Sequence, residues 1–302
     1  MPSFLSNLVP VFLRVTGANR TLTSAARAEK HIVKAARRRP WVRPPNYVAD
    51  RTRLTVAEAE VGAGTMPVAT LAPRTGESRG AVIYLHGGSW VNEIAPQHWQ
   101  LTTQIATEAS TTVIVPIYPL LPSPAATAEH VVAAVVELAI AARAEHGGVC
   151  LAGDSAGGQI ALSAALALRD AGVVVPRTIL ISPALDLSMK NPEMDAVQPS
   201  DPWLAKSGNR VFIDAWRGAL PVSDPRVSPL EGDLTGLGPL TIFSGTRDIL
   251  NPDARLLVSK ARATGVSVDY REEAGLVHVY PLTPTSEARE ARAAIVSQLT
   301  VR

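Results

Sequence analysis

Cysteine is almost absent from this chain of 302 residues, which contains only Cys150. A single cysteine excludes an intramolecular disulfide and a metal site built from a cysteine cluster. Long apolar runs are absent as well, so the sequence predicts no membrane-spanning helix. The apolar N-terminus has no basic residue ahead of its first run, which argues against a secretory signal peptide. Together these absences predict a cytoplasmic protein.

The composition is that of a globular protein. Hydrophobic residues make up 46% of the chain and charged residues 19%, which excludes disordered, collagen-like and coiled-coil proteins. No internal repeat or low-complexity tract is present. The length fits one large α/β domain or two smaller ones.

Charge is distributed unevenly along the chain. Residues 1–43 contain one acid, Glu29, and nine basic residues: Arg14, Arg20, Arg27, Lys30, Lys34, Arg37, Arg38, Arg39 and Arg43. Such a segment can bind nucleic acid or an anionic membrane, form a solvated helix face, or dock on the acidic remainder of the molecule. Because only Trp41 lies among these residues as a stacking platform, we expect no nucleic-acid partner.

From residue 81 onward, short β-branched runs alternate with longer helical patterns. Strands are predicted at residues 81–85, 111–115, 148–153, 177–182, 239–244 and 266–271. Helices are predicted at residues 96–110, 125–145, 155–171, 252–264 and 286–299. Alternation of this kind, with nearly continuous apolar strands, predicts a mostly parallel central sheet with helices on both faces.

Two segments depart from this alternation. Residues 1–45 are basic and helical, and residues 186–236 are long and proline-rich. We interpret both as parts of a helical cap over a catalytic domain of residues 46–302, with the second segment inserted into that domain. The first sixteen residues carry an apolar helical stripe: Phe4, Leu5, Leu8, Val9, Phe12 and Leu13. That stripe favours cap packing over a pocket, and weak interfacial contact with a membrane stays open.

Gly153-Asp154-Ser155-Ala156-Gly157 is the strongest functional signal in the sequence. It lies between a predicted strand and a predicted helix, which is the setting of a nucleophile elbow. Glycine is needed two residues before and two residues after Ser155 because larger side chains would clash in so sharp a turn. The turn presents the serine hydroxyl at a helix N-terminus, where negative charge is favoured. Asp154 is interpreted as structural, with its side chain pointing away from Ser155.

A second motif, His86-Gly87-Gly88-Ser89-Trp90, directly follows the strand at residues 81–85. An oxyanion hole needs two or three N–H donors that converge on one oxygen. Gly87 and Gly88 let the backbone approach that oxygen, and the Ala156 N–H is the third donor expected. His86 is expected to anchor the loop through backbone hydrogen bonds.

A serine nucleophile needs a base, and the base needs an acid that orients it. Of the six histidines, only His278 lies in a loop between the last strand and the last helix. The acid is expected between Ser155 and His278 in sequence, at the end of a strand. Asp248 fits best and Asp186 is the runner-up, whereas Asp253 is explained by the start of a helix.

These motifs together resemble the bacterial hormone-sensitive-lipase-like branch (family IV) of the α/β-hydrolases, over about residues 45–300. The resemblance implies an α/β-hydrolase fold, hydrolysis of carboxylic esters by a Ser155, Asp248 and His278 triad, and no cofactor or metal. Two departures stand out. Ser89 replaces a frequent third glycine, and the segment at residues 116–122 keeps only Tyr118, Leu120 and Pro122 of a longer family motif.

The predicted function is that of a serine carboxylesterase that cleaves short- to medium-chain esters through an acyl-enzyme. An arylformamidase-like amide hydrolase is the main alternative, because His-Gly-Gly-x-Trp is also similar to that family's motif. A non-catalytic receptor on the same scaffold is the third. The expected partner is a small ester, and a homodimer stays open. Candidate pocket residues are Trp90, Trp203, Trp216, Val279 and Tyr280, each of which is also a candidate for core packing.

Overall fold

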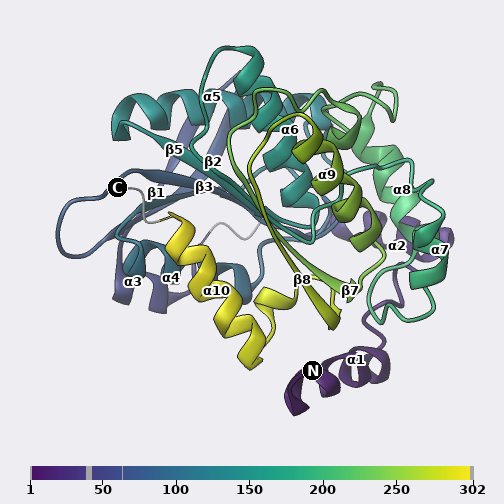
Figure 1. Cartoon of the computed structure of the whole chain (residues 1–302). Coiled ribbons are helices and arrows are strands. Elements are labelled where there is room, and N and C mark those ends of the chain that lie inside the picture. Colours follow the sequence, from purple (N-terminus) through teal and green to yellow (C-terminus); the bar gives the residue numbers. More distant parts are fainter. Residues whose placement is uncertain (1, 39–42, 63, 300–302) are drawn as a thin grey trace.

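A computed structural model describes residues 2–38, 43–62 and 64–299, so Arg39 and Trp41 of the basic segment lie outside it. The strands of the described residues form one sheet in the order β1-β2-β4-β3-β5-β6-β7-β8 (Figure 1). They are β1 (Thr52–Val61), β2 (Gly64–Pro73), β3 (Ala81–Leu85), β4 (Thr112–Pro116), β5 (Val149–Asp154), β6 (Thr178–Ile181), β7 (Leu240–Arg247) and β8 (Val268–Val277). The pairs β1–β2 and β2–β4 are antiparallel, and the remaining pairs are parallel.

The six strands expected from the sequence are present as β3 to β8, which confirms the mostly parallel sheet. The antiparallel hairpin of β1 and β2 was not predicted. β1 is largely exposed, so it lacks the continuous apolar run by which the buried strands were recognised. A turn signal was present, because Gly62 directly follows the ten-residue β1 and Gly64 begins the ten-residue β2. β8 also extends beyond the predicted residue 271, to Val277.

Helices cover both faces of the sheet (Figure 1). The core on one face includes residues of α5 (Ala128–His146), α6 (Ala156–Asp170) and α9 (Asn251–Ala263). The core on the other face includes residues of α3 (Asn46–Arg51), α4 (Pro96–Glu108) and α10 (Ser286–Leu299). Successive β3 side chains alternate between these cores: Ile83 and Leu85 lie in the first, and Val82 and Tyr84 lie in the second. Burial on both faces explains the apolar strands.

The two segments predicted to form a cap touch each other. The N-terminal one contains α1 (Phe4–Thr16) and α2 (Ala25–Ala35), and the insertion contains α7 (Glu193–Val197) and α8 (Lys206–Arg217). Short 3-10 helices follow at η1 (Pro229–Glu231) and η2 (Tyr280–Leu282). The Gly208 N–H of α8 donates to the Leu22 carbonyl at 2.8 Å, and a Cβ on Gly208 would lie 2.4 Å from the Leu22 Cα. Glycine is therefore required where the two segments meet.

Candidate active site

Ser155 lies in the sharp turn between β5 and α6. Its φ of 52° and ψ of −118° are strained for a residue with a side chain. A Cβ on Gly153 would lie 2.3 Å from the Gly157 carbonyl oxygen, and one on Gly157 would lie 2.0 Å from the Leu85 carbonyl oxygen. Both glycines therefore meet the steric demand that the sequence predicted for them.

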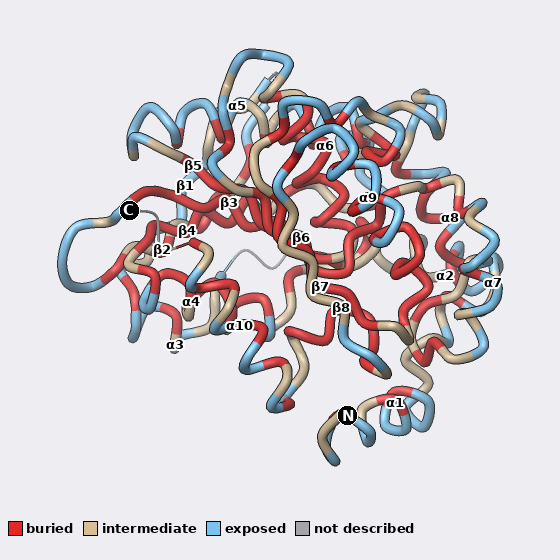
Figure 2. Tube along the Cα trace, in the orientation of Figure 1, coloured by how far each residue is buried: buried red, intermediate tan, exposed pale blue. Residues whose placement is uncertain are grey.

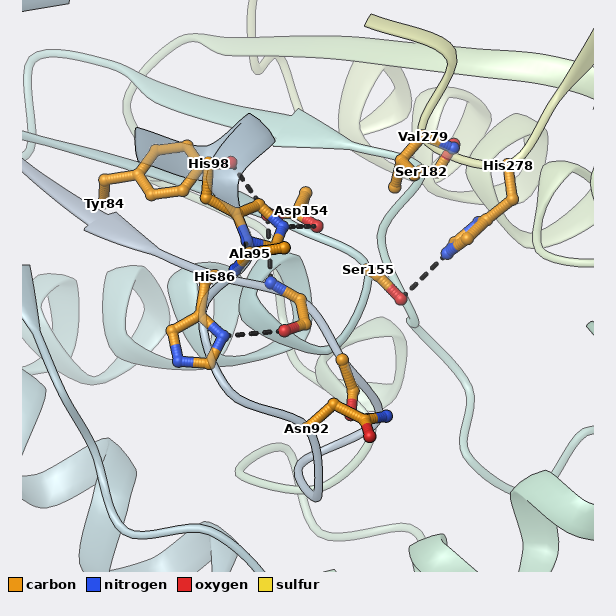
Figure 3. Close-up of polar contacts among 12 residues, drawn as sticks. Tyr84, His86, Asn92, Ala95, His98, Asp154, Ser155, Ser182, His278 and Val279 are labelled. Atoms are coloured by element: carbon orange, nitrogen blue, oxygen red, sulfur yellow. Dashed lines mark hydrogen bonds and ion pairs between the residues drawn. The ribbon is translucent and has the colours of Figure 1, made fainter. Parts of the chain in front are cut away.

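His278 bridges Ser155 and Asp248. Its Nε2 lies 2.9 Å from the Ser155 Oγ (Figure 3), and its Nδ1 lies 2.7 Å from the Asp248 Oδ2. The Asp248 Oδ1 accepts a hydrogen bond from the Leu250 N–H at 2.9 Å, which fixes the carboxylate from its other side. The Asp248 side chain is fully buried. The structure thus brings together, in one line, three residues that directly follow β5, β7 and β8.

The electrostatics of this line favour a protonated imidazole. Burial lowers the pKa of His278, but the Asp248 carboxylate, with contributions from Asp201 and Asp154, outweighs burial and raises that pKa above its ordinary value. Positive charge that develops on His278 is therefore stabilised.

The residue after His278 is held in an unusual conformation. Val279 has a φ of 47°, which is a genuine outlier for a β-branched residue. Its N–H donates to the Ser182 Oγ at 3.0 Å (Figure 3). Strain of this kind persists only where the surroundings impose it, and here it sets the direction of the His278 loop.

The loop after β3 lies against Asp154, and this corrects one expectation. The Gly87 N–H donates to the Asp154 Oδ1 at 3.0 Å, so this predicted oxyanion donor is already engaged. Within the described residues, no hydrogen bond is present for the Gly88 or Ala156 N–H. A Cβ on Gly87 would lie 3.0 Å from the Ser155 Cβ, so the loop closely approaches the serine.

Asp154 is the centre of a buried polar network beneath that loop (Figure 3). Its Oδ1 also accepts from the Tyr84 hydroxyl at 2.8 Å, and its Oδ2 lies 3.3 Å from the His98 Nε2. The Ala95 N–H donates to the His98 Nδ1, so the proton of a neutral His98 sits on Nε2 and points to Asp154. Burial raises the pKa of Asp154, but His98 and Tyr84 outweigh it and the pKa is lowered.

His86 and Tyr118 support the same loop from behind. The His86 Nδ1 lies 2.7 Å from the Gly87 carbonyl oxygen, and the Tyr118 hydroxyl donates to the His86 carbonyl oxygen at 2.6 Å. The two rings stack with centroids 4.5 Å apart. Burial, together with His98, lowers the pKa of His86 to about 4, so His86 is neutral near pH 7. These contacts are the backbone anchoring expected of His86.

Two cavities meet at Ser155 and differ greatly in size. The larger, about 870 Å³, is lined by His278, Gly88 and the residue pair Trp203 and Leu204. The smaller, about 20 Å³, is lined by Ala156, by the polar residues Asp186 and Asn209, and by several apolar side chains, but not by His278.

The five candidate pocket residues divide between these cavities and the core. Trp203 and Val279 line the large cavity, and Trp90 lines the small one. Trp216 and Tyr280 line neither, because both side chains are buried in the hydrophobic core. Trp216 stacks on Trp90 at 5.4 Å between ring centroids. For Trp216 and Tyr280 the structure therefore favours core packing, the alternative that the sequence analysis left open.

A family model described as the alpha/beta hydrolase fold matches residues 82–282. The chain belongs to the α/β-hydrolase family. LipR of Mycobacterium tuberculosis, whose name describes an acetyl-hydrolase, is 32% identical over 78% of this chain and 77% of that protein.

Further relatives agree with this assignment. An acetyl-hydrolase of Streptomyces hygroscopicus is 33% identical over 66% of this hydrolase and 67% of that protein. The structure of a hormone-sensitive lipase from a metagenome library superposes with a TM-score of 0.74 at 22% identity, over 98% of each chain. The resemblance drawn from the motifs is confirmed, and the chain is a carboxylic ester hydrolase.

Asp201 was missed by sequence reasoning. This buried residue of the hydrolase's insertion accepts hydrogen bonds on Oδ1 from the Trp203 and Leu204 N–H groups, and on Oδ2 from the Ile249 N–H at 2.9 Å. Burial and the nearby Asp248 carboxylate raise the pKa of Asp201 to about 6. Asp201 thus ties a wall of the large cavity to the loop of the acid. No sequence motif distinguished it from other loop aspartates.

His31 lies in the basic segment, as the sequence indicated, but its place at the large cavity was missed. It lines the large cavity, and its Nε2 lies 2.7 Å from the Asn92 Oδ1. The Asn92 side chain in turn donates to the Gly88 carbonyl at 3.1 Å, so α2 contacts the loop after β3 through two side chains.

The other aspartates lie apart from His278. Asp186 accepts from the Ser188 N–H and hydroxyl, and Asp253 accepts from the Asn191 amide near the start of α9.

Cys150 is a buried strand residue, and burial raises its thiol pKa to about 11. Within residues 2–38, 43–62 and 64–299, no group of His, Cys, Asp or Glu could hold a metal ion. The same ranges contain no helix long and apolar enough to cross a membrane.

Proposed function

We propose that this hydrolase is a serine carboxylesterase in which Ser155 is the nucleophile, His278 the general base and Asp248 the residue that orients His278. The continuous line from the Asp248 Oδ2 through both His278 nitrogens to the Ser155 Oγ, with steps of 2.7 and 2.9 Å, supports this proposal. Both distances lie within the range that proton transfer and orientation require.

The reaction takes two steps. The His278 Nε2 removes the Ser155 proton as Oγ attacks the ester carbonyl, and the C=O π electrons move onto the carbonyl oxygen. When the tetrahedral intermediate collapses, the ester C–O bond breaks, and His278 delivers that proton to the departing alcohol oxygen. Water then attacks the acyl-enzyme by the same route, which releases the acid and restores Ser155.

The oxyanion of each intermediate is held by the Gly88 and Ala156 N–H groups. The N–H of Gly87 is committed to Asp154, so its role is to fix the loop that carries Gly88. Two donors are sufficient for an oxyanion hole, and removal of one such donor typically costs about 100- to 1000-fold in rate.

The two cavities take the two halves of the ester. The alcohol oxygen must face His278 to receive its proton, and His278 lines only the larger cavity. The acyl group then points into the smaller cavity, next to Ala156. A volume of about 20 Å³ holds little more than one water-sized group. The geometry therefore favours the short end of the predicted acyl range, an acetyl or propionyl ester, on a larger and apolar alcohol.

Hydrolysis of p-nitrophenyl esters from acetate to palmitate tests this proposal. We expect turnover to be highest with acetate, to fall steeply as the acyl chain grows, and to be lost in Ser155→Ala. Ser297→Ala, on the exposed side of α10, is the matched control and should retain the wild-type rate. Wild-type activity in Ser155→Ala would refute the nucleophile. An aryl formamide cleaved faster than the matching formate ester would favour the amide-hydrolase alternative instead.

The acyl side is tested separately by widening the small cavity. Ile213 of α8 lines that cavity, so Ile213→Ala should raise the rate on butyrate relative to acetate. The ratio within one preparation is unaffected by loss of folded protein. An unchanged ratio would show that the acyl group lies elsewhere, while leaving the catalytic residues untouched.

A further inference from the structure

The N-terminal helix α1 exposes an unusual amount of apolar surface. Six of the eleven exposed large apolar side chains in the described residues lie on this helix: Phe4, Leu5, Leu8, Val11, Phe12 and Val15. At 100° per residue these six occupy one contiguous arc of the helix. Phe4 is 77% exposed and Val15 is 81% exposed. An apolar face of this kind is typical of a surface that binds a partner.

The opposite face of α1 is fixed to the protein, so the helix presents its apolar arc in a defined direction. Ser6, Pro10 and Leu13 are the buried residues of α1. The Ser6 hydroxyl donates to the Glu287 carboxylate of α10 at 2.8 Å. The Arg14 guanidinium donates to the Ser200 carbonyl at 3.2 Å. Figure 2 shows α1 as a largely exposed element at the edge of the molecule.

One edge of the apolar arc borders the large cavity. Leu5, Leu8 and Phe12 line that cavity together with Ser155 and His278. The remaining members of the arc, Phe4, Val11 and Val15, do not line it and face solvent. The apolar arc is thus continuous with the entrance through which an apolar substrate would reach Ser155.

The segment that carries this face is also basic, and its described basic residues form no salt bridge within the part of the chain that the structure describes. All eight described basic residues of the N-terminal segment are exposed: Arg14, Arg20, Arg27, Lys30, Lys34, Arg37, Arg38 and Arg43. None of the salt bridges among the described residues includes any of them. Docking of this segment on the acidic remainder of the chain, one of the expectations from sequence, gains no support from these salt bridges and stays a prediction. The free charge complements an anionic surface.

We propose that the N-terminal segment docks on an anionic lipid surface, with the apolar arc of α1 in the headgroup region and the basic residues against lipid phosphates. An amphipathic helix that lies in the interface combines these two features. On the further premise of the proposed esterase function, this orientation turns the large cavity toward the lipid, so that apolar esters enter it from the bilayer.

Sedimentation with phosphatidylcholine vesicles, with and without phosphatidylglycerol, tests the docking. Ser155→Ala is the background, because it prevents any turnover of lipid. We expect the protein to bind the vesicles that contain phosphatidylglycerol and to be released by salt. In that background, Phe4→Ser/Val11→Ser/Val15→Ser should weaken binding by about tenfold or more. Ile140→Ser/Val174→Ser/Leu256→Ser removes three exposed apolar side chains elsewhere and should leave binding unchanged.

The charge contribution has its own variant. Arg27→Gln/Lys30→Gln/Lys34→Gln, on the exposed face of α2, should weaken binding to phosphatidylglycerol vesicles and reduce its dependence on salt. Undiminished binding of the α1 triple variant would overturn the proposal, and so would no binding of the background protein. A wild-type dimer that the α1 triple variant converts to a monomer, without vesicle binding, would show that a second copy covers this face. Hydrolysis of p-nitrophenyl acetate in vesicle-free buffer reports on the esterase function alone.

Discussion

The site around Ser155 and the N-terminal segment are built in opposite ways. At the site, polar groups are buried and paired: the carboxylates of Asp154, Asp201 and Asp248 all accept hydrogen bonds from named donors. On α1 and α2, apolar side chains are exposed and basic ones have no ion-pair partner within the described residues. Hydrogen bonds fix the positions of the side chains in the first region, whereas the second region exposes apolar and charged surface.

This difference reflects what each task requires. Proton transfer and oxyanion stabilisation depend on distances that must hold within a fraction of an ångström, so buried hydrogen bonds fix each group. Contact with a lipid surface depends on area and charge, neither of which needs a defined partner. Mutations in the first region should therefore change turnover strongly, and mutations in the second should change binding with little effect on turnover.

Replacement of Asp248, the proposed orienting acid, should lower kcat more than any other change described below. Asp248→Asn keeps the size of the side chain but removes the charge and favours the wrong tautomer of His278, so we expect kcat to fall about ten-thousand-fold. Turnover of p-nitrophenyl acetate measures this loss, while circular dichroism should show an unchanged fold. Asp214→Asn, at an exposed ion pair with Arg217, is the control, and Asp186→Asn tests the runner-up from sequence. If Asp186→Asn caused the larger loss, the assignment of the acid would be reversed.

Asp154→Asn, in the polar network beneath the loop that carries Gly88, should have the second-largest effect on kcat. Asp154 accepts from the Tyr84 hydroxyl and the Gly87 N–H and faces the His98 Nε2. Asn at this position turns an amide NH₂ toward one of these donors, so we expect a loss of stability of about 1–3 kcal/mol. kcat should fall about 10- to 100-fold because the loop that carries Gly88 shifts.

Urea denaturation and steady-state kinetics on the same preparation check both effects of Asp154→Asn. Asp170→Asn, at an exposed ion pair with Arg169, is the matched control and should be close to wild type in both. If the free energy of unfolding fell by about 1–3 kcal/mol while kcat stayed unchanged, Asp154 would support the core without positioning the loop that carries Gly88.

The residues around Ser155 and Asp154 also show which parts of the candidate site could be predicted from the sequence. Ser155, His278 and Asp248 were predictable because each follows a recognisable strand and because a steric rule ties Gly153 and Gly157 to the elbow. The hydrogen bond from the Gly87 N–H to Asp154 was not predictable. A pair of glycines in a sequence does not reveal which of the two N–H groups donates to a nearby carboxylate. Asp154 was expected to point away from Ser155, and the structure shows what it reaches there.

Contacts between residues far apart in the sequence were what the sequence analysis mainly failed to predict. Asp201 lies 47 positions before Asp248, in a segment without periodicity, so only the folded chain reveals that its Oδ2 binds the Ile249 N–H. Trp216 was assigned to a pocket because a buried aromatic and a pocket aromatic look alike in sequence. The β1–β2 hairpin was missed because an exposed edge strand lacks the apolar run of a central one.

Asp201→Asn should have a smaller effect than either change above, and a different signature. The amide cannot accept at both positions, so one buried N–H loses its partner and kcat should fall about tenfold. The Asp201 charge helps to raise the pKa of His278. In the proposed mechanism His278 must be neutral to accept the Ser155 proton. The wild-type profile of kcat/KM should therefore rise with a midpoint above 6.5, and that midpoint should be lower in the variant.

The pH profile separates positioning from simple loss of packing. A variant that only loosens the loop would lower kcat without moving the midpoint, because the charge near His278 would be unchanged. Leu204→Ala, which removes an apolar wall residue of the same loop, provides that control. Equal midpoints in wild type and Asp201→Asn would exclude an electrostatic contribution from Asp201.

Loosening α1 should have the smallest effect on turnover. The Glu287 carboxylate accepts hydrogen bonds from the Ser3 N–H, the Ser3 hydroxyl and the Ser6 hydroxyl, which hold the start of α1 on α10. In Glu287→Gln one carboxylate oxygen becomes an amide donor, so α1 should detach more often. We expect kcat on p-nitrophenyl acetate to change less than about twofold, because none of these contacts includes Ser155, His278 or Asp248. Limited proteolysis in residues 17–24 should become faster, and Glu290→Gln, one helical turn along α10, should leave it unchanged. If Glu287→Gln instead abolished turnover, α1 would belong to the fixed region around Ser155, and the contrast between the two regions would fail at this helix.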